Sequence, residues 1–104
     1  MGSRLERPGA ERVSGARAEQ IRLLRGDKPE DHYPAEARQL SVDGYAAVDL
    51  LLNEDGFVLE ASVFLESPPD AGFGLAALDV AKTYEFYNPL KKLVLLDVVI
   101  SFLP

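Results

Sequence analysis

The sequence has no cysteine and no tryptophan, and it has one histidine among its 104 residues. The lack of cysteine excludes disulfide frameworks, thiol nucleophiles and thiolate metal sites. A single imidazole, His32, cannot build a histidine metal cluster, and no glycine-rich phosphate loop or nucleophile elbow is present. The aspartates that could form carboxylate pairs, Asp43, Asp49, Asp55 and Asp97, are expected in turns or facing solvent. We therefore predict a protein that is not an enzyme and that uses no metal or cofactor.

The sequence also lacks an apolar run long enough to cross a membrane. The longest run, from Leu93 to Leu103, is interrupted by Asp97 and Ser101. A helix that spans a bilayer needs about 20 residues. The arginine-rich N-terminus does not contain the apolar stretch of a signal peptide. A chain of 104 residues accommodates one small domain with a single core.

Positive charge is scarce except near the N-terminus. Acidic residues outnumber basic ones 17 to 11, giving a net charge of −6. Residues 1–30 carry seven bases and five acids (+2), whereas residues 31–104 carry four bases and twelve acids (−8). An acidic domain repels phosphate backbones, so we expect no nucleic-acid partner. All aromatic residues lie at or beyond Tyr33. We therefore predict a flexible or loosely docked segment over 1–31, containing at most a short helix between Ala16 and Leu24, and a folded domain over 32–104.

Regular patterns begin after residue 31. Pro34 at the start of several helix-forming residues predicts a short helix over 34–40. From Tyr45 the apolar residues alternate, with Ala46, Val48, Leu50 and Leu52 on one face, which predicts a strand. The turn over 53–56 and the alternation over 57–65 predict a hairpin, with Gly56 at a positive φ. In the returning strand the odd positions from Phe57 to Leu65 are all apolar.

The second half of the domain predicts a helix over 73–84 and a last strand over 93–103. The aromatic residues Tyr84, Phe86 and Tyr87 are expected to pack into the core at the end of that helix. A right-handed crossover places the last strand beside the first. The predicted fold is α+β, a three-stranded antiparallel sheet of order 2-1-3 with two helices on one face.

This topology leaves the third strand on an open edge, where another strand can pair. The sheet face away from the helices is too apolar to be fully in contact with water. Either residues 1–30 or a crystal neighbour cover it, or it binds a peptide or a second copy. The residues expected on this face are Tyr45, Leu51, Val58, Phe64, Leu95 and Val99, with Asp49, Glu60 and Asp97 between them.

Several motifs follow one another along residues 32–104: Tyr33-Pro34-x-x-Ala37-Arg38, Asp43-Gly44 and Glu54-Asp55-Gly56. They precede an Ala76-Ala77-Leu78 helix that is followed by aromatic residues and Pro89. In this order and spacing the sequence resembles the C-terminal domain of TonB-family energy transducers. The sequence departs from the family pattern at several positions: Tyr84 replaces a tryptophan, Glu85 a usually basic residue, Phe57 an arginine or lysine, and Glu66-Ser67 a pair of serines.

The resemblance implies a periplasmic interaction domain that a tether, not contained in these residues, connects to an inner-membrane helix. It implies strand addition by a short segment of an outer-membrane transporter, which couples proton-motive energy to transport. The acidic surface would attract acidic partner segments less. The alternative is a structural or self-associating module of the cell envelope, including a homodimer through the third-strand edge or the open face. The expected partner-binding residues are Glu30, Asp31, His32, Tyr33, Leu95, Asp97, Val99 and Ser101.

Overall fold

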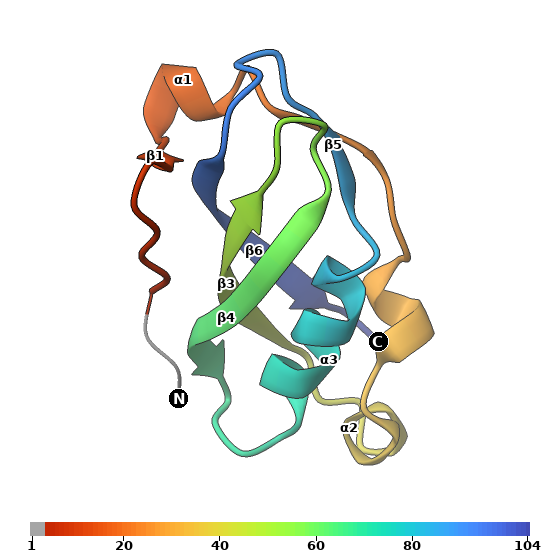
Figure 1. Ribbon diagram of the computed structural model, residues 1–104. Helices are drawn as coiled ribbons and strands as arrows, with labels where there is room; N and C mark the ends of the chain where they lie inside the picture. The colour runs from red at the N-terminus through yellow and green to blue at the C-terminus, as the bar shows by residue number, and fades with distance from the viewer. Residues whose placement is uncertain (1–3) are drawn as a thin grey trace.

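The computed structural model describes residues 4–104, so the first three residues of the predicted N-terminal segment lie outside the described residues. The strands form a four-stranded sheet of order β1-β6-β3-β4 and a two-stranded sheet of β2 and β5 (Figure 1). In chain order the elements are β1 (Glu11–Arg12), α1 (Gly15–Ala18), β2 (Arg22–Arg25), the 3-10 turn η1 (Pro29–His32), α2 (Ala35–Gln39), β3 (Gly44–Leu52), β4 (Val58–Ser67), α3 (Phe73–Ala81), β5 (Glu85–Tyr87) and β6 (Val94–Phe102).

The main sheet confirms the predicted α+β class. β3 pairs antiparallel with both β4 and β6, which gives the predicted order 2-1-3 for the three long strands. The prediction of a fully open edge on the third strand is wrong at its start, because β1 pairs there in parallel and adds a fourth strand. Figure 1 shows α3 on one side of this sheet and the N-terminal segment along the other.

The core lies between the sheet and α3. The predicted inward residues of β3, among them Val48, Leu50 and Leu52, are completely buried there. Phe73 of α3 and Phe102 of β6 pack with ring centroids 5.3 Å apart, and the Tyr33 ring meets both edge-on. Each of these buried aromatic side chains contributes roughly 1.5–3 kcal/mol. This side of the sheet is therefore held by hydrophobic contacts.

The hairpin turn forms as the sequence predicts. The Asn53 side-chain oxygen accepts the N–H groups of Asp55 and Phe57 at 2.9 and 3.0 Å. Gly56 has a φ of +88°, and a Cβ there would lie 1.8 Å from the Phe86 carbonyl oxygen. Glycine is therefore required both by the backbone conformation and by the close approach of β5.

Two irregularities in the pairing of β3 with β4 overturn part of the predicted face assignment. The register shifts between Ala47 and Val48 and again between Leu51 and Leu52, so that Leu52 lies opposite Val58 and Ala47 opposite Leu65. A bulge reverses the side to which the following residues point. Val58 consequently packs against the core instead of the outer face, and Leu65 pairs with an outer-face residue.

The predicted helix over 73–84 ends earlier, at Ala81. The Thr83 hydroxyl donates to the Val80 carbonyl at 2.7 Å, and the chain then turns so that the Phe86 N–H donates to the Gly56 carbonyl at 2.9 Å. Of the three aromatic residues expected in the core, Phe86 is buried, Tyr84 is partly buried and Tyr87 is 51% exposed. The expectation for Tyr87 is therefore wrong, because Phe86 and Tyr87 are neighbours in strand β5, where successive side chains point to opposite sides, so that Tyr87 faces outward when Phe86 is buried.

The N-terminal segment lies along the sheet from its first described residues. The helix expected between Ala16 and Leu24 is only the single turn α1, and Arg22–Arg25 instead form β2, which pairs with β5. Val13 and Ile21 are buried within the main core cluster. α2 begins at Ala35, directly after Pro34, one residue later than predicted.

Candidate protein-interaction site

The free side of β6 is only partly covered by β1. The N–H groups of Glu11 and Val13 donate to the carbonyls of Leu93 and Leu95, each at 3.0 Å. The β1 pairing ends at Leu95, and no other strand in residues 4–104 pairs with this side of β6. Successive residues of a strand point their backbone groups to alternate sides. The backbone groups of every second residue after Leu95 therefore face the uncovered edge: Asp97, Val99 and Ser101.

The outer face of the sheet carries two carboxylates directly opposite each other, Asp49 on β3 and Asp97 on β6. Asp49 is 0% exposed, which overturns the expectation that it faces solvent. The Arg12 guanidinium donates to both Asp49 oxygens, at 2.9 and 2.7 Å, and to Asp97 at 3.2 Å. The Leu5 N–H donates to the same Asp49 carboxylate at 2.7 Å. A paired guanidinium and a backbone donor together satisfy the buried charge.

Further arginines extend this contact between residues 4–13, which we call the N-terminal arm, and the outer face. Arg4 pairs with Asp97 at 2.9 Å, and its guanidinium lies 4.6 Å from the centre of the Phe64 ring. Arg7 pairs with Glu60 on β4. The arm therefore pairs its arginines with three outer-face carboxylates: Arg12 with the buried Asp49, Arg4 and Arg12 with Asp97, and Arg7 with Glu60.

The two central carboxyls have opposite pKa shifts. Burial raises the pKa of Asp49, but the hydrogen bonds from Arg12 and the Leu5 N–H outweigh it and hold the pKa below its ordinary value. Burial and the adjacent Asp49 carboxylate raise the pKa of Asp97, despite the opposing charge of Arg4. The charged form of Asp49 is thus stabilised by its hydrogen bonds, whereas the charged form of Asp97 is destabilised by burial and by its neighbour Asp49.

The arm explains why the apolar outer face is not simply open to water. Leu51 and Leu95, predicted to lie there, are 1% and 5% exposed. Beyond the arm, Val99 and Tyr45 remain 66% and 39% exposed. The first of the predicted alternatives, coverage by the chain's own N-terminal residues, therefore accounts for the part of this face around Asp49. The part around Val99 and Tyr45, alongside the uncovered edge of β6, remains accessible.

Sequence reasoning missed Arg12 and Leu5 as residues of this site. A usable signal was present, because two aspartates were expected among apolar side chains on one sheet face, and such carboxylates need cationic partners. The basic excess of residues 1–30 matches that need. Nothing in the local pattern of residues 4–13 indicates which arginine pairs with which carboxylate.

The predicted site residues before α2 fall into two groups. Tyr33 is buried in the core, and its hydroxyl donates to the Val42 carbonyl, so it is not free to contact a partner directly. Glu30, Asp31 and His32 lie in η1, which packs near β6 and α3. Because Tyr33 contacts Phe102, this segment adjoins the C-terminal end of β6.

Glu30, Asp31 and His32 of η1 are each engaged locally. His32 Nε2 lies 2.7 Å from Asp27, the Asp31 carboxylate accepts the Lys28 N–H at 3.3 Å, and the Glu30 carbonyl accepts from Arg38 at 2.8 Å. The carboxylates of Glu30 and Asp31 remain at the surface. The structure thus brings η1 to one end of β6, while Asp97, Val99 and Ser101 line its free edge and Leu95 is already paired with β1.

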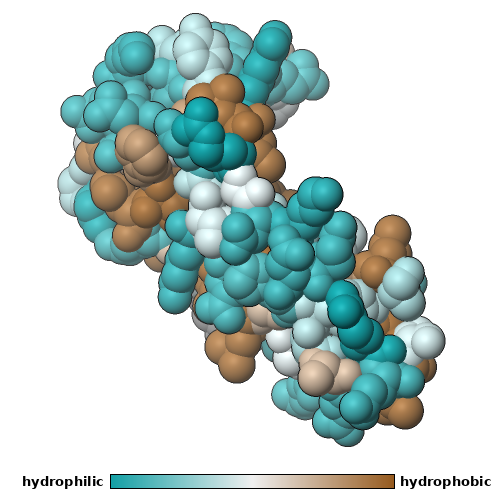
Figure 2. Space-filling view, turned by 90° about the vertical axis from the view of Figure 1, so that its right-hand side faces the viewer, coloured by the Kyte–Doolittle hydropathy of each residue, from teal (hydrophilic) through white to brown (hydrophobic). Residues whose placement is uncertain are grey.

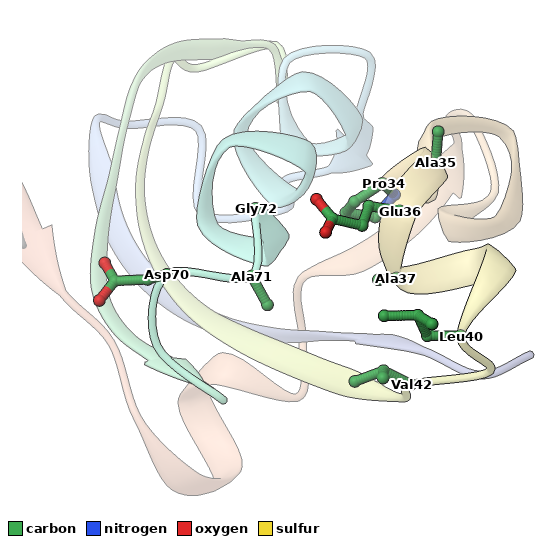
Figure 3. Close-up of a pocket in the computed structure, with 9 residues that line it drawn as sticks. All are labelled: Pro34, Ala35, Glu36, Ala37, Leu40, Val42, Asp70, Ala71 and Gly72. Atoms are coloured by element: carbon green, nitrogen blue, oxygen red, sulfur yellow. The ribbon is translucent and has the colours of Figure 1, made fainter.

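A separate hollow of about 500 Å³ lies between α2 and the loop before α3 (Figure 3). Glu36 points into the space between the two helices, whereas Asp70 points away from α2. The remaining walls are small or aliphatic, and no group of acidic or histidine side chains within residues 4–104 is arranged to hold a metal ion. This hollow contains no catalytic constellation.

The surface beside α2 and α3 is mostly hydrophilic, with hydrophobic side chains in separate patches (Figure 2). Among residues 4–104 there is no helix with the length and apolar character that a membrane crossing requires.

Comparison with known proteins identifies the family. The solution structure of the TonB C-terminal domain of Pseudomonas aeruginosa matches the fold with a TM-score of 0.61 and 20% identity, over 88% of this chain and 90% of that one. No curated protein matches the sequence. The family model for the Gram-negative bacterial TonB protein C-terminal region matches residues 29–102. The chain therefore belongs to the family of TonB C-terminal domains.

Proposed function

We propose that this domain acts in the periplasm and binds a short segment of an outer-membrane transporter by strand addition to the uncovered edge of β6. The family takes part in TonB-dependent transport and is a non-catalytic interaction domain. The observation that carries the proposal is the row of unpaired backbone groups at Asp97, Val99 and Ser101, next to an exposed Val99 side chain. An open edge of this kind is a template for an extended peptide.

Strand addition suits a domain that transmits force to several different transporters. The bound segment would be held mainly by backbone hydrogen bonds, which depend little on its side chains. β6 is itself bonded along its whole length to the central strand β3. A load on the added strand would therefore pass into the middle of the sheet. An inner-membrane anchor, connected by a tether, would supply that load from proton-motive energy.

The η1 segment adds a second contact in this proposal. The carboxylates of Glu30 and Asp31 are exposed beside the C-terminal end of β6, with His32 next to them. A partner segment that continues past Ser101 would meet these side chains. Their negative charge favours a partner with basic groups at that point.

The proposal is tested by titrating the full chain with synthetic transporter-segment (TonB-box) peptides and recording amide NMR shifts. We expect shifts at residues 95–101 and 30–32. Val99→Pro removes a backbone donor from the free edge and should abolish binding, whereas Val99→Ala keeps that donor and should bind normally.

Two outcomes would contradict the proposal. One is the absence of binding at millimolar peptide, and the other is equal binding by the two Val99 variants. Sedimentation at several concentrations provides the test of the alternative, a self-associating module. A dimer that Val99→Pro dissociates would show that the edge serves a second copy of the chain.

A further inference from the structure

The N-terminal arm makes two kinds of contact with the sheet. Its last residues add as a short strand to the edge of β6, and its side chains reach over the outer face. It pairs in parallel with the first residues of β6, and it places Arg12 over the Asp49 and Asp97 carboxylates. Leu51 and Leu95 on the same face are buried, and Arg7 of the arm pairs with Glu60, which lies opposite Leu51. The arm thus combines backbone pairing and charge pairing beside apolar surface. The arm therefore shows what kind of extended segment this face accepts.

We propose that the outer face of β3 and β6 selects a partner segment that carries an arginine. In the free chain Arg12 occupies the position of that arginine, and the partner displaces it. The inference rests on the proposed function, because it concerns the chemistry of the segment that adds to β6. The partner is an extended segment of another protein that runs parallel to β6, with its arginine level with Leu95. Its other side chains would include an aliphatic residue close to Leu51.

The geometry favours arginine over lysine. The two oxygens of Asp49 each accept one N–H from different nitrogens of Arg12, at 2.9 and 2.7 Å. A planar guanidinium can make this two-point contact, and the single ammonium group of lysine cannot. Asp97 lies on the adjacent strand and takes a third contact from the same group at 3.2 Å.

Removal of the arm would leave a strongly acidic surface. Asp49, Asp97 and Glu60 would each lose an arginine partner, so the uncovered face would carry up to three negative charges beside two leucines. Such a face would attract a cationic segment with apolar residues and would repel an acidic one. This property follows from the residues of this chain at positions 49, 60 and 97.

The arm is held loosely enough to be displaced. Its outer ion pairs involve side chains that are about 40–50% exposed, namely those of Arg4 and Arg7. Ion pairs of this kind contribute roughly 0–1 kcal/mol each. Only Val13 among residues 4–13 is buried in the core. Arg12 is the main anchor, and a partner arginine would replace its contacts one for one.

The test uses the full chain and two synthetic peptides. One peptide has the sequence of residues 4–13, and the other has the same sequence with Arg12→Gln. Binding is measured by amide shifts at residues 93–101 in the wild-type chain and in the full-length Arg12→Gln variant. Arg22→Gln serves as the matched control, because Arg22 is an exposed arginine on β2, away from the carboxylate pair.

We expect the arginine peptide to bind the Arg12→Gln chain at least roughly tenfold more tightly than the glutamine peptide, as loss of a charge-assisted bidentate contact implies. It should bind the wild-type and Arg22→Gln chains more weakly, since both keep the arm in place. Asp49→Asn added to the Arg12→Gln chain should remove the difference between the peptides. Asp97→Asn, a milder change at an exposed residue, should reduce it.

The outcomes separate this inference from the proposed function. Equal binding of the two peptides to the Arg12→Gln chain would overturn the arginine preference while leaving strand addition intact. If Val99→Pro does not weaken the binding of the TonB-box peptides, the edge beyond Leu95 is not the site, and the proposed function fails together with the inference that rests on it. A concentration-dependent dimer of the wild-type chain that Arg12→Gln abolishes would assign the face to an exchanged arm of a second copy, and would also overturn the inference.

Discussion

The two faces of the main sheet are covered by different means. On the inner face α3 packs through apolar and aromatic side chains, with Phe73 and Phe102 completely buried. On the outer face the N-terminal arm is attached through arginines, with a buried carboxylate at the centre. Hydrophobic burial contributes in proportion to area, whereas exposed ion pairs contribute little. The comparison indicates that α3 stays on the inner face as long as the domain is folded, whereas the N-terminal arm can dissociate from the outer face.

The largest expected effect comes from the inner face. Phe102→Ala removes a ring that contacts both Phe73 and Tyr33, and it should lower the free energy of unfolding by about 3–5 kcal/mol. Denaturant titration followed by circular dichroism measures this change. Val99→Ala lies on the same strand but faces outward, and it should change stability by no more than about 0.5 kcal/mol. Similar values for the two variants would contradict the assignment of faces.

The second effect is local and belongs to the outer face. Arg12→Gln should release the arm without unfolding the domain, because Asp49 regains contact with water once the arm leaves. The loss is therefore limited to the docking free energy of the arm, about 1–3 kcal/mol. Amide hydrogen exchange of Glu11 and Val13, which donate to β6, should accelerate at least roughly tenfold.

Amides of β3 that pair with β6 provide the internal reference for this measurement. Their exchange should stay close to that of the wild-type chain, as it should everywhere in Arg22→Gln. Faster exchange throughout the sheet of Arg12→Gln would show that the arm is part of the cooperative fold. The distinction between a permanent and a removable cover would then be incorrect.

The inner face was the more predictable of the two. Alternation over Ala46–Leu52 and over Val94–Phe102 reveals which side chains point toward α3, because a buried face leaves a period of two in the sequence. The errors arose where a single residue changed the register. The bulges in the pairing of β4 moved Val58 inward and Leu65 outward, and such insertions have no strong sequence signal.

The outer face was predictable only in its requirement for a cover. Its mixture of leucines and aspartates indicates that a segment with apolar and cationic side chains packs against it. A strand as short as Glu11–Arg12 has no period of its own and is defined by its partner, so β1 could not be located from the sequence. Of the four residues predicted at the edge of β6, Asp97, Val99 and Ser101 lie beyond the β1 pairing and Leu95 lies within it, and the role of all four in binding remains a prediction.

The third effect is the response of the arm to pH. The pKa of Asp97 is raised, so this group takes up a proton first as the pH falls, and repulsion of Asp49 then decreases. The pKa of Asp49 is lowered by Arg12 and Leu5 against the effect of burial. Its contribution to docking is thus present above the ordinary aspartate pKa, about 3.9, and disappears as the pH falls from there through its folded value.

We therefore expect the arm to stay docked while Asp97 titrates and to separate only when Asp49 is protonated. Carboxyl carbon shifts report the two titrations, and exchange of the Val13 amide reports docking. Asp97→Asn should remove the first step and leave the second. Release of the arm during the Asp97 titration would show that Asp97, and not Asp49, is the main anchor of the outer face.

The smallest effect separates Arg7 from Arg12. Both arginines pair with a carboxylate on the outer face, but the Arg7 and Glu60 side chains are 39% and 47% exposed, whereas Asp49 is fully buried. Water screens the exposed pair, so Arg7→Gln should lower the docking free energy of the arm by less than about 1 kcal/mol. Exchange of the Val13 amide should then rise severalfold at most, and the difference from wild type should shrink further in high salt, which screens exposed charges.

An effect as large as that of Arg12→Gln would mean that the arm is held by its summed positive charge. In that case a partner segment with a lysine would bind as well as one with an arginine. Its affinity would depend on the overall negative potential of the outer face and not on the two-point contact at Asp49.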